Sequence, residues 1–181
     1  MEKLRVSVLV SGNGTNLQAI LDAIEDGRLA NVEIVQVISS KADAYALKRA
    51  EEAEIPAVTV TKHEYNDIRD RMNAIKMYLD GERTDLVVLA GYVSIIPPKV
   101  IKAYEGRIIN VHPALLPRHG GKDCYGLKVH ERVIRNKEEE SGATVHYVDE
   151  GIDTGEIILQ KKVPVLDGDI PETLQKRVQE A

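Results

Sequence analysis

The chain has 181 residues, of which 43% are hydrophobic and 29% charged, and its formal net charge is -5 at pH 7. These values predict one folded domain, and the negative charge argues against a general nucleic-acid binder, which would present a basic face. The single cysteine, Cys124, excludes an internal disulfide and a paired-cysteine zinc site. No apolar run approaches the roughly 20 residues of a membrane span, and the first residues lack a signal peptide's apolar core. We therefore expect a cytoplasmic protein that binds neither membranes nor nucleic acid.

The chain opens with a predicted strand, a glycine-rich turn and a helix. Leu4–Val10 is a β-branched apolar run typical of a buried parallel strand. The turn, Ser11–Asn16, precedes apolar residues at helical spacing that continue up to Gly27. Such a turn brings backbone N–H groups close to an anion at a helix N-terminus, and we expect Thr15 or Asn16 to cap the helix.

This turn differs from two common phosphate-binding loops. It lacks the Gly-Lys-Ser/Thr of a Walker A loop. A dinucleotide fingerprint needs a small residue where Leu17 stands and an acid after the second strand, Val32–Ile38, which is followed instead by Ser39-Ser40-Lys41. The turn predicts a monophosphate site and no NAD site, although a Gly-x-Gly turn alone is as often structural as functional.

Strands and helices continue to alternate. We expect a helix at 42–53, a strand at 55–60, a second helix at 65–79 and a buried strand at 85–90. The apolar segment Val93–Ile96 follows, and it suits either a flat apolar pocket or a buried connection. This alternation predicts an α/β fold with a doubly wound, mostly parallel sheet, whose ligands bind at the carboxyl edge of the strands.

Asn110 and His112 are the strongest catalytic candidates. They lie in an apolar run that begins at Ile108, before Pro113 and Pro117 end regular structure. Because residues two apart in an extended chain point to the same side, the amide and the imidazole should share one face. An amide N–H and a protonated imidazole stabilise a developing oxyanion, although both residue types also simply end strands.

The last third of the chain mixes loops, strands and helices. We expect a mobile glycine-rich loop at 119–126, a helix at 127–135 and a solvated charged turn at 137–140. A strand at 142–148, a tight acidic turn at 149–155, an antiparallel strand at 157–165 and a helix at 171–181 should follow. His146 is expected to be a strand-face residue without a catalytic role.

Four segments, taken together, resemble the formyltransferase family: Ser11–Gln18, Leu89–Tyr92, Asn110–Pro117 and Asp149–Gly155. Enzymes that transfer or hydrolyse the formyl group of formyl-folates share the third segment and the distal aspartate. The first segment is similar to that of the branch that formylates glycinamide ribonucleotide in purine biosynthesis. The resemblance implies a single formyltransferase domain over residues 1–181, with a Rossmann-like sheet, an antiparallel C-terminal strand and a last helix that lacks its end.

The resemblance also implies transfer of a formyl group from 10-formyltetrahydrofolate to the amine of glycinamide ribonucleotide. The implied site residues are, for catalysis, Asn110, His112 and Asp153; for the ribonucleotide, Gly14, Thr15 and Asn16; and for the formyl-folate, Val93, Ser94, Ile95 and Ile96 with Asn110. Ser94 departs from the arginine of many relatives. The implied partners are small molecules only, no metal is implied, and the protein is expected to be a monomer or a homodimer.

The residues fit this chemistry on their own terms. Attack of an amine on a formyl carbon creates a tetrahedral oxyanion to which Asn110 and a protonated His112 can donate. We expect Asp153 to raise the pKa of His112, because a nearby carboxylate favours the imidazolium. The proton then leaves through His112 or through a water held by Asp153. Two alternatives stay open: a formyltetrahydrofolate hydrolase, and a folate- or phosphate-binding module without activity.

Overall fold

The computed structural model describes residues 2–181, and the chain divides into two compact units, one ending at Ile108 and the other beginning at Ile109. Each unit is described in turn. Within residues 2–181 there is no helix whose length and apolar character would let it span a bilayer.

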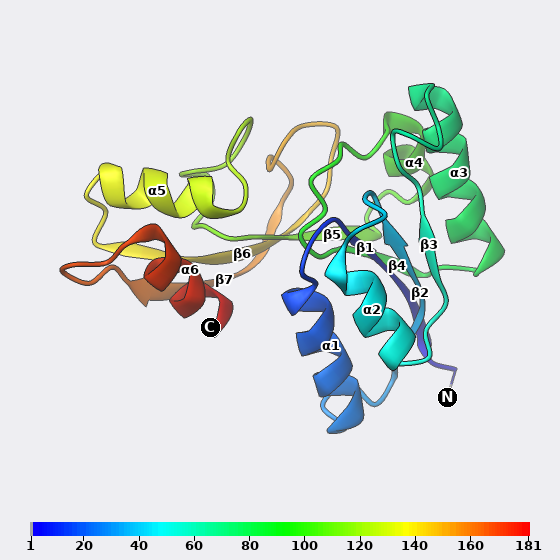
Figure 1. Ribbon diagram of the computed structural model, residues 1–181, viewed down its shortest axis with the longest axis horizontal. Helices are drawn as coiled ribbons and strands as arrows, with labels where there is room; N and C mark the ends of the chain where they lie inside the picture. Colours follow the sequence, from blue (N-terminus) through cyan, green and yellow to red (C-terminus); the bar gives the residue numbers. More distant parts are fainter. Residues whose placement is uncertain (1) are drawn as a thin grey trace. The chain divides into compact units, whose positions relative to one another are not determined.

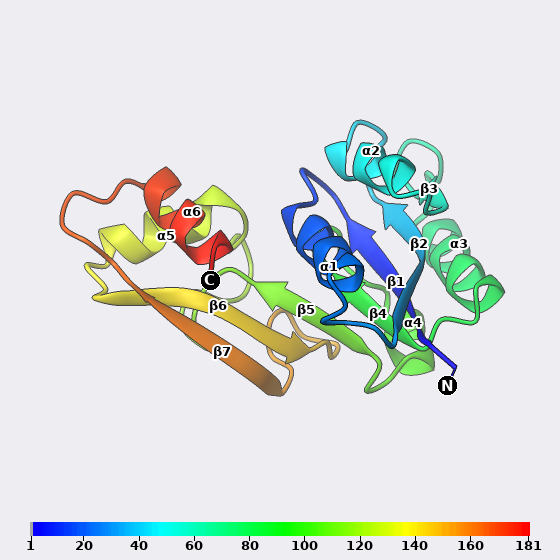
Figure 2. The same cartoon turned by 90° about the horizontal axis from the view of Figure 1, so that it is seen from below.

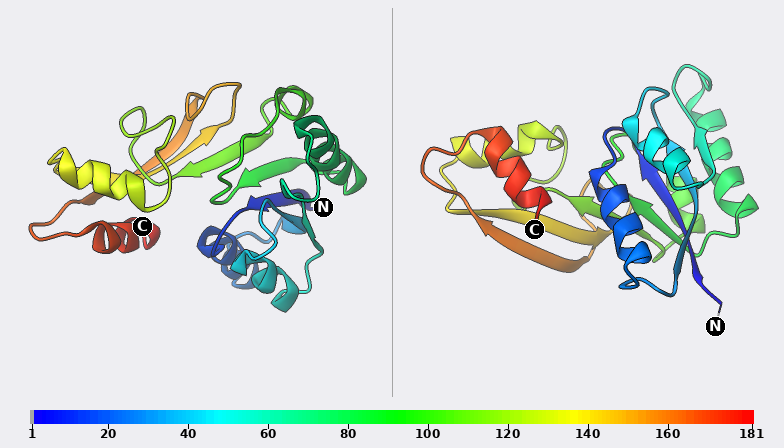
Figure 3. Two further views of the ribbon diagram at one scale, coloured as in Figure 1. Left: turned by 45° about the horizontal axis from the view of Figure 1, so that its top comes forward. Right: turned by 60° about the horizontal axis from the view of Figure 1, so that its bottom comes forward.

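The first unit alternates strands and helices as predicted (Figure 1). Its elements are β1 (Leu4–Val10), α1 (Thr15–Glu25), β2 (Val32–Ser39), α2 (Tyr45–Glu52), β3 (Ala57–Thr59), α3 (Ile68–Gly81), β4 (Leu86–Leu89) and α4 (Pro98–Ala103). The strands run parallel in the order β3-β2-β1-β4. Helices α1 and α2 cover one face, and α3 and α4 cover the other (Figure 3). The doubly wound parallel sheet is thus confirmed within this unit.

Strand β1 lies inside this sheet, and its side chains are among the most deeply buried of the unit. Val8, Leu9 and Val10 have no exposed surface, and neither do Val37 and Ile38 of the neighbouring β2. A strand that is covered by helices on both faces needs apolar side chains on both, so continuous apolar runs replace alternation. Helix α4 was not predicted. Pro98 occupies its first turn, where a missing N–H costs nothing.

The strand order reverses at β1, which lies between β2 and β4. In such sheets the ends of the diverging strands leave a crevice that binds ligands. Here the Ser11 hydroxyl, directly after β1, accepts a hydrogen bond from the Val93 N–H at 3.0 Å and lies 2.6 Å from the Ser40 hydroxyl. The glycine turn and the segment after β4 therefore meet, as the sequence predicted.

The glycine turn is held tightly against α2. Gly14 adopts a left-handed φ of 71° and is the N-cap of α1, with no side-chain cap. The expectation that Thr15 or Asn16 caps the helix is therefore wrong: both lie inside the first helical turn. A Cβ on Gly14 would lie 2.6 Å from the Cβ of Ala46, so backbone conformation and packing both require glycine.

The second unit is a three-stranded antiparallel sheet with two helices. Its elements are β5 (Ile108–His112), α5 (Leu127–Arg135), β6 (Glu140–Tyr147), β7 (Ile157–Pro164) and α6 (Pro171–Gln179), and β5 begins one residue before the division between the units. Strand β6 pairs with β5 and β7. Helices α5 and α6 lie over one face of β6 and β7 (Figure 2), where Val133, Val163, Leu174 and Val178 form a buried cluster. The predicted antiparallel C-terminal strand is confirmed.

We expect Gly14→Ala to destabilise the protein more than Gly27→Ala. Both positions have a left-handed φ, which costs an alanine about 1–2 kcal/mol. Only Gly14 adds a steric clash, which should cost about another 1–3 kcal/mol, because no described atom lies within 4 Å of a Cβ on Gly27. Urea unfolding of both variants measures the difference, and equal losses would show that the contact with Ala46 relaxes freely.

Candidate active site

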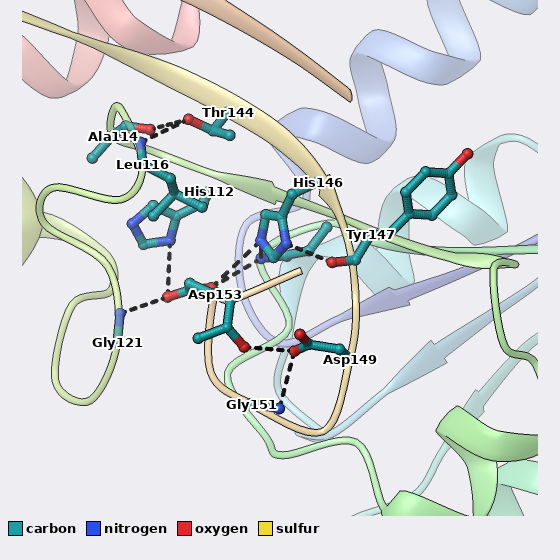
Figure 4. Close-up of polar contacts among 12 residues, drawn as sticks. His112, Ala114, Leu116, Gly121, Thr144, His146, Tyr147, Asp149, Gly151 and Asp153 are labelled. Atoms are coloured by element: carbon teal, nitrogen blue, oxygen red, sulfur yellow. Dashed lines mark hydrogen bonds and ion pairs between the residues drawn. The ribbon is translucent and has the colours of Figure 1, made fainter. Parts of the chain in front are cut away.

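The carboxyl-terminal half of β5 carries the two predicted catalytic side chains on one face. Asn110 is half-buried, and His112 is only 3% exposed. Both contact the carboxylate of Asp153. Its Oδ2 lies 3.4 Å from His112 Nδ1 (Figure 4), and its Oδ1 accepts from Asn110 Nδ2 at 3.5 Å. The structure thus brings Asp153, which is distant in the sequence, to the neighbouring pair Asn110 and His112.

The acidic turn between β6 and β7 places Asp153. The Asp149 carboxylate accepts hydrogen bonds from the Gly151 N–H at 3.0 Å and the Thr154 hydroxyl at 2.6 Å, which closes the turn. Asp153 itself has a left-handed φ of 57°. A non-glycine residue in this conformation is held there by its surroundings, and such strain is frequent at functional sites. The Gly121 N–H, from the glycine-rich loop, donates to Oδ2 at 3.0 Å.

His146 is a fourth member of the cluster that was missed in the sequence. In the antiparallel ladder it stands directly opposite Asn110. Its Nε2 lies 3.1 Å from Asn110 Nδ2 and 3.6 Å from Asp153 Oδ1, and its Nδ1 lies 2.8 Å from the Tyr147 carbonyl. The prediction of a strand-face residue is confirmed, but that face is the one that carries the cluster. The pairing of β5 with β6, which sets His146 opposite Asn110, is the signal that would have identified His146 as a member of the cluster.

The Asp153 carboxylate is charged despite its burial. Burial alone would raise its pKa, but the neighbouring imidazoles of His146 and His112 and the Gly121 N–H together outweigh burial, so the pKa of Asp153 lies below its ordinary value. The cluster therefore contains one fixed negative charge that two imidazoles share.

The two imidazoles respond to this charge in opposite directions. Burial lowers the pKa of His112 below its ordinary value, and the charge of Asp153 and the His119 carbonyl offset burial only in part. For His146, burial also lowers the pKa, but the neighbouring Asp153 carboxylate and the hydrogen bond to the Tyr147 carbonyl outweigh burial, so the pKa is raised. The prediction that Asp153 raises the pKa of His112 above its ordinary value is wrong, because desolvation of the deeply buried ring dominates.

The hydrogen bonds of His112 fix its neutral tautomer. Its Nε2 lies 2.9 Å from the His119 carbonyl oxygen, which can only accept, so Nε2 carries the hydrogen. In the neutral ring, Nδ1 then presents its lone pair toward Asp153. This nitrogen is the place where a proton is gained or lost beside a carboxylate.

The segment after β5 is attached to β6 by one buried threonine. Thr144 donates to the Ala114 carbonyl at 2.6 Å and accepts from the Leu116 N–H at 3.1 Å (Figure 4). Gln160, on β7, donates to both the Thr144 hydroxyl and the Leu116 carbonyl at 2.9 Å. These bonds fix the chain just beyond His112, so the ring has a rigid support.

The predicted substrate-binding residues lie in the first unit. Gly14 is buried, Thr15 is exposed and Asn16 is half-buried at the start of α1, where helix N–H groups are free to bind an anion. After β4, Val93 and Ile95 are 52% and 77% exposed. Ser94 is half-buried, whereas Ile96 is only 5% exposed and packs in the core.

Comparison with known proteins agrees with this arrangement. Residues 4–181 match the family described as formyl transferase. The phosphoribosylglycinamide formyltransferase of Haemophilus influenzae is 42% identical over 176 residues, which are 97% of this chain and 80% of that enzyme. Glycinamide ribonucleotide transformylase 1 from Symbiobacterium toebii has a similar crystal structure, with a TM-score of 0.91 and 39% identity over 98% of this chain and 81% of that one.

A hydrolytic enzyme has a similar structure at lower identity. The formyltetrahydrofolate deformylase from Pseudomonas syringae pv. tomato is 27% identical, with a TM-score of 0.88 over 99% of this chain and 57% of that chain. The family match spans nearly all of the sequence, and relatives of similar length exceed a third in identity. The chain belongs to the formyl transferase family.

Proposed function

We propose that this chain transfers a formyl group from 10-formyltetrahydrofolate to the amine of glycinamide ribonucleotide in purine biosynthesis, and that Asn110, His112 and Asp153 perform the chemistry. The observation that carries the assignment of residues is the contact of one buried carboxylate with both the amide and the imidazole. The relatives that match over nearly the whole chain support the choice of reaction.

The first unit offers features that suit both substrates. The exposed apolar side chains of Val93 and Ile95 suit the flat ring of a folate, and the start of α1 suits a phosphate. Their joining through Ser11 supports one site at the carboxyl edge of this sheet. When bound, 10-formyltetrahydrofolate supplies the formyl carbon that the amine attacks.

The second unit carries the side chains that suit charge stabilisation and proton transfer. The Asn110 amide is a hydrogen-bond donor for the oxyanion. Protonated His112 supplies a positive charge beside that amide, while its two nitrogens face the His119 carbonyl and Asp153. Because burial lowers the pKa of His112, the ring is mostly neutral before reaction. The charge of Asp153 offsets part of this effect and so helps the ring to accept a proton. The proton that the amine loses therefore passes to Nδ1 of His112, or to a water held by Asp153, on its way to the leaving nitrogen.

A formyl-transfer assay tests the proposal directly. With purified protein, formyl-folate should be consumed at a rate that depends on added glycinamide ribonucleotide, and formylated product should appear in equal amount. Consumption at the same rate without the amine substrate would identify a hydrolase. Tight binding of either compound without turnover would identify a binding module. We further propose that the protein is cytoplasmic. We also propose that it is a monomer or a homodimer, which gel filtration of the same preparation tests.

Asn110→Ala should lower kcat by roughly 10²–10³, because removal of an oxyanion donor raises the barrier without weakening ground-state binding. KM for both substrates should change little. Asn136→Ala is the matched control, because Asn136 is exposed at the C-terminus of α5. Steady-state kinetics of both variants decide the matter: an unchanged kcat in Asn110→Ala would remove the amide from the mechanism.

Asp153→Asn should lower activity and move the histidine limb of the pH–rate profile to lower pH. The carboxylate raises the pKa of His146 and partly offsets the effect of burial on His112, so its loss lowers the pKa of both rings. Measuring kcat/KM against pH for the wild type and the variant tests this direction. If the histidine limb of the profile stays at the same pH in the variant, the pKa values of His112 and His146 do not depend on the charge of Asp153.

A further inference from the structure

We propose that Glu138 is a positioning residue for His112, acting through His119 to hold the carbonyl that selects the Nε2–H tautomer of the catalytic ring. This inference rests on the proposed function for its effect on rate. The underlying contacts lie entirely within the second unit and can be tested without turnover.

The proposal begins at the carbonyl of His119. This oxygen accepts from His112 Nε2 at 2.9 Å and is the only acceptor that the described residues offer that nitrogen. If the carbonyl turned away, Nε2–H would lose its acceptor, and Asp153 would draw part of the population toward the Nδ1–H tautomer. The reactive lone pair would then leave the side of the ring that faces the carboxylate.

The direction of this carbonyl is not set by ordinary backbone preference. His119 has a left-handed φ of 55°, although histidine is among the few residue types that enter this region with some frequency. The segment belongs to neither a helix nor a strand. Some other contact must therefore hold the peptide in place.

The side chain of His119 supplies that contact. It is only 7% exposed, and its Nε2 lies 3.1 Å from Glu138 Oε1. The second oxygen of Glu138 accepts from Arg118 Nη1 at 3.0 Å. One carboxylate thus anchors two consecutive residues, and the second of these presents its carbonyl to His112.

The carboxylate is itself well supported. Glu138 follows α5, and its N–H donates to the Val133 carbonyl at 3.3 Å in the turn that ends this helix. Its side chain is 23% exposed, whereas Arg118 is 75% exposed. The bond to His119 is therefore the more shielded of the two and should be the stronger constraint.

A cavity beside this pair offers a way to test the role chemically. It has a volume of about 400 Å³ and is lined by Leu115, Arg118, His119, Val133 and residues 137–141. The Nδ1 atom of His119 has no partner among the described residues. A small carboxylate such as acetate can therefore reach the space that truncation of Glu138 would open.

The decisive experiment compares Glu138→Ala with Glu139→Ala. Glu139 is adjacent, exposed and lines the same cavity, so it controls for loss of negative charge. Nitrogen-15 NMR of the ring should show the Nε2–H tautomer of His112 in the wild type and in Glu139→Ala, and a mixture of tautomers in Glu138→Ala. An unaltered tautomer in folded Glu138→Ala overturns the proposal, whether or not the protein transfers formyl groups.

Kinetics provide the second measurement. In Glu138→Ala, kcat should fall about tenfold, the effect of one ordinary hydrogen bond, while KM stays within the error of the wild type. Added acetate should restore part of kcat in Glu138→Ala and none in Asn110→Ala. Glu138→Gln keeps an acceptor for His119 and should remain close to wild type.

If Glu138→Ala does not fold, His119→Asn takes its place. Asparagine tolerates the left-handed backbone but is too short to reach Glu138, so the same mixture of tautomers is expected. A single wild-type tautomer in that variant would also overturn the proposal. Absence of formyl transfer by the wild type, together with the predicted tautomers, would reject the proposed function and leave the positioning role intact.

Discussion

The candidate active site depends on one buried carboxylate that is shared by two imidazoles and an amide. Asp153 is 12% exposed, yet its pKa remains low because His146, His112 and a backbone N–H all favour its charged form. A charge of this kind is stable in the interior only when several partners compensate its lost hydration. The positions of Asn110, His112 and His146 around it are therefore interdependent, and none of them can be understood from its own segment alone.

The sharing of one charge separates the roles of the two histidines. The carboxylate of Asp153 and the Tyr147 carbonyl raise the pKa of His146, whereas burial lowers the pKa of His112. Two titratable groups with pKa values pushed in opposite directions are characteristic of acid–base sites. In this arrangement His146 favours the charged form of Asp153, and the proposed role of His112 is to accept a proton during the reaction.

The parallel sheet and the pairing of Asn110 with His112 on one face could be predicted from the sequence, because both follow from local residue patterns. The parallel strands follow from continuous apolar runs such as Leu4–Val10, and the common face of Asn110 and His112 follows from the two-residue period of a strand. Long-range features escaped prediction. The ladder that sets His146 opposite Asn110 and the bond between His119 and Glu138 join residues 36 and 19 positions apart. Neither separation leaves a periodic signal, and the acidic run at 137–140 was interpreted only as a solvated face.

The hydroxyl of Thr144 has a consequence for how the chain beyond His112 moves. It donates once and accepts twice, which uses the whole hydrogen-bonding capacity of a hydroxyl group. No capacity is left for water, and the residue has no exposed surface. The Leu116 amide is therefore shielded from solvent exchange for as long as the segment after β5 stays attached to Thr144, and this attachment resists fraying of the end of β5.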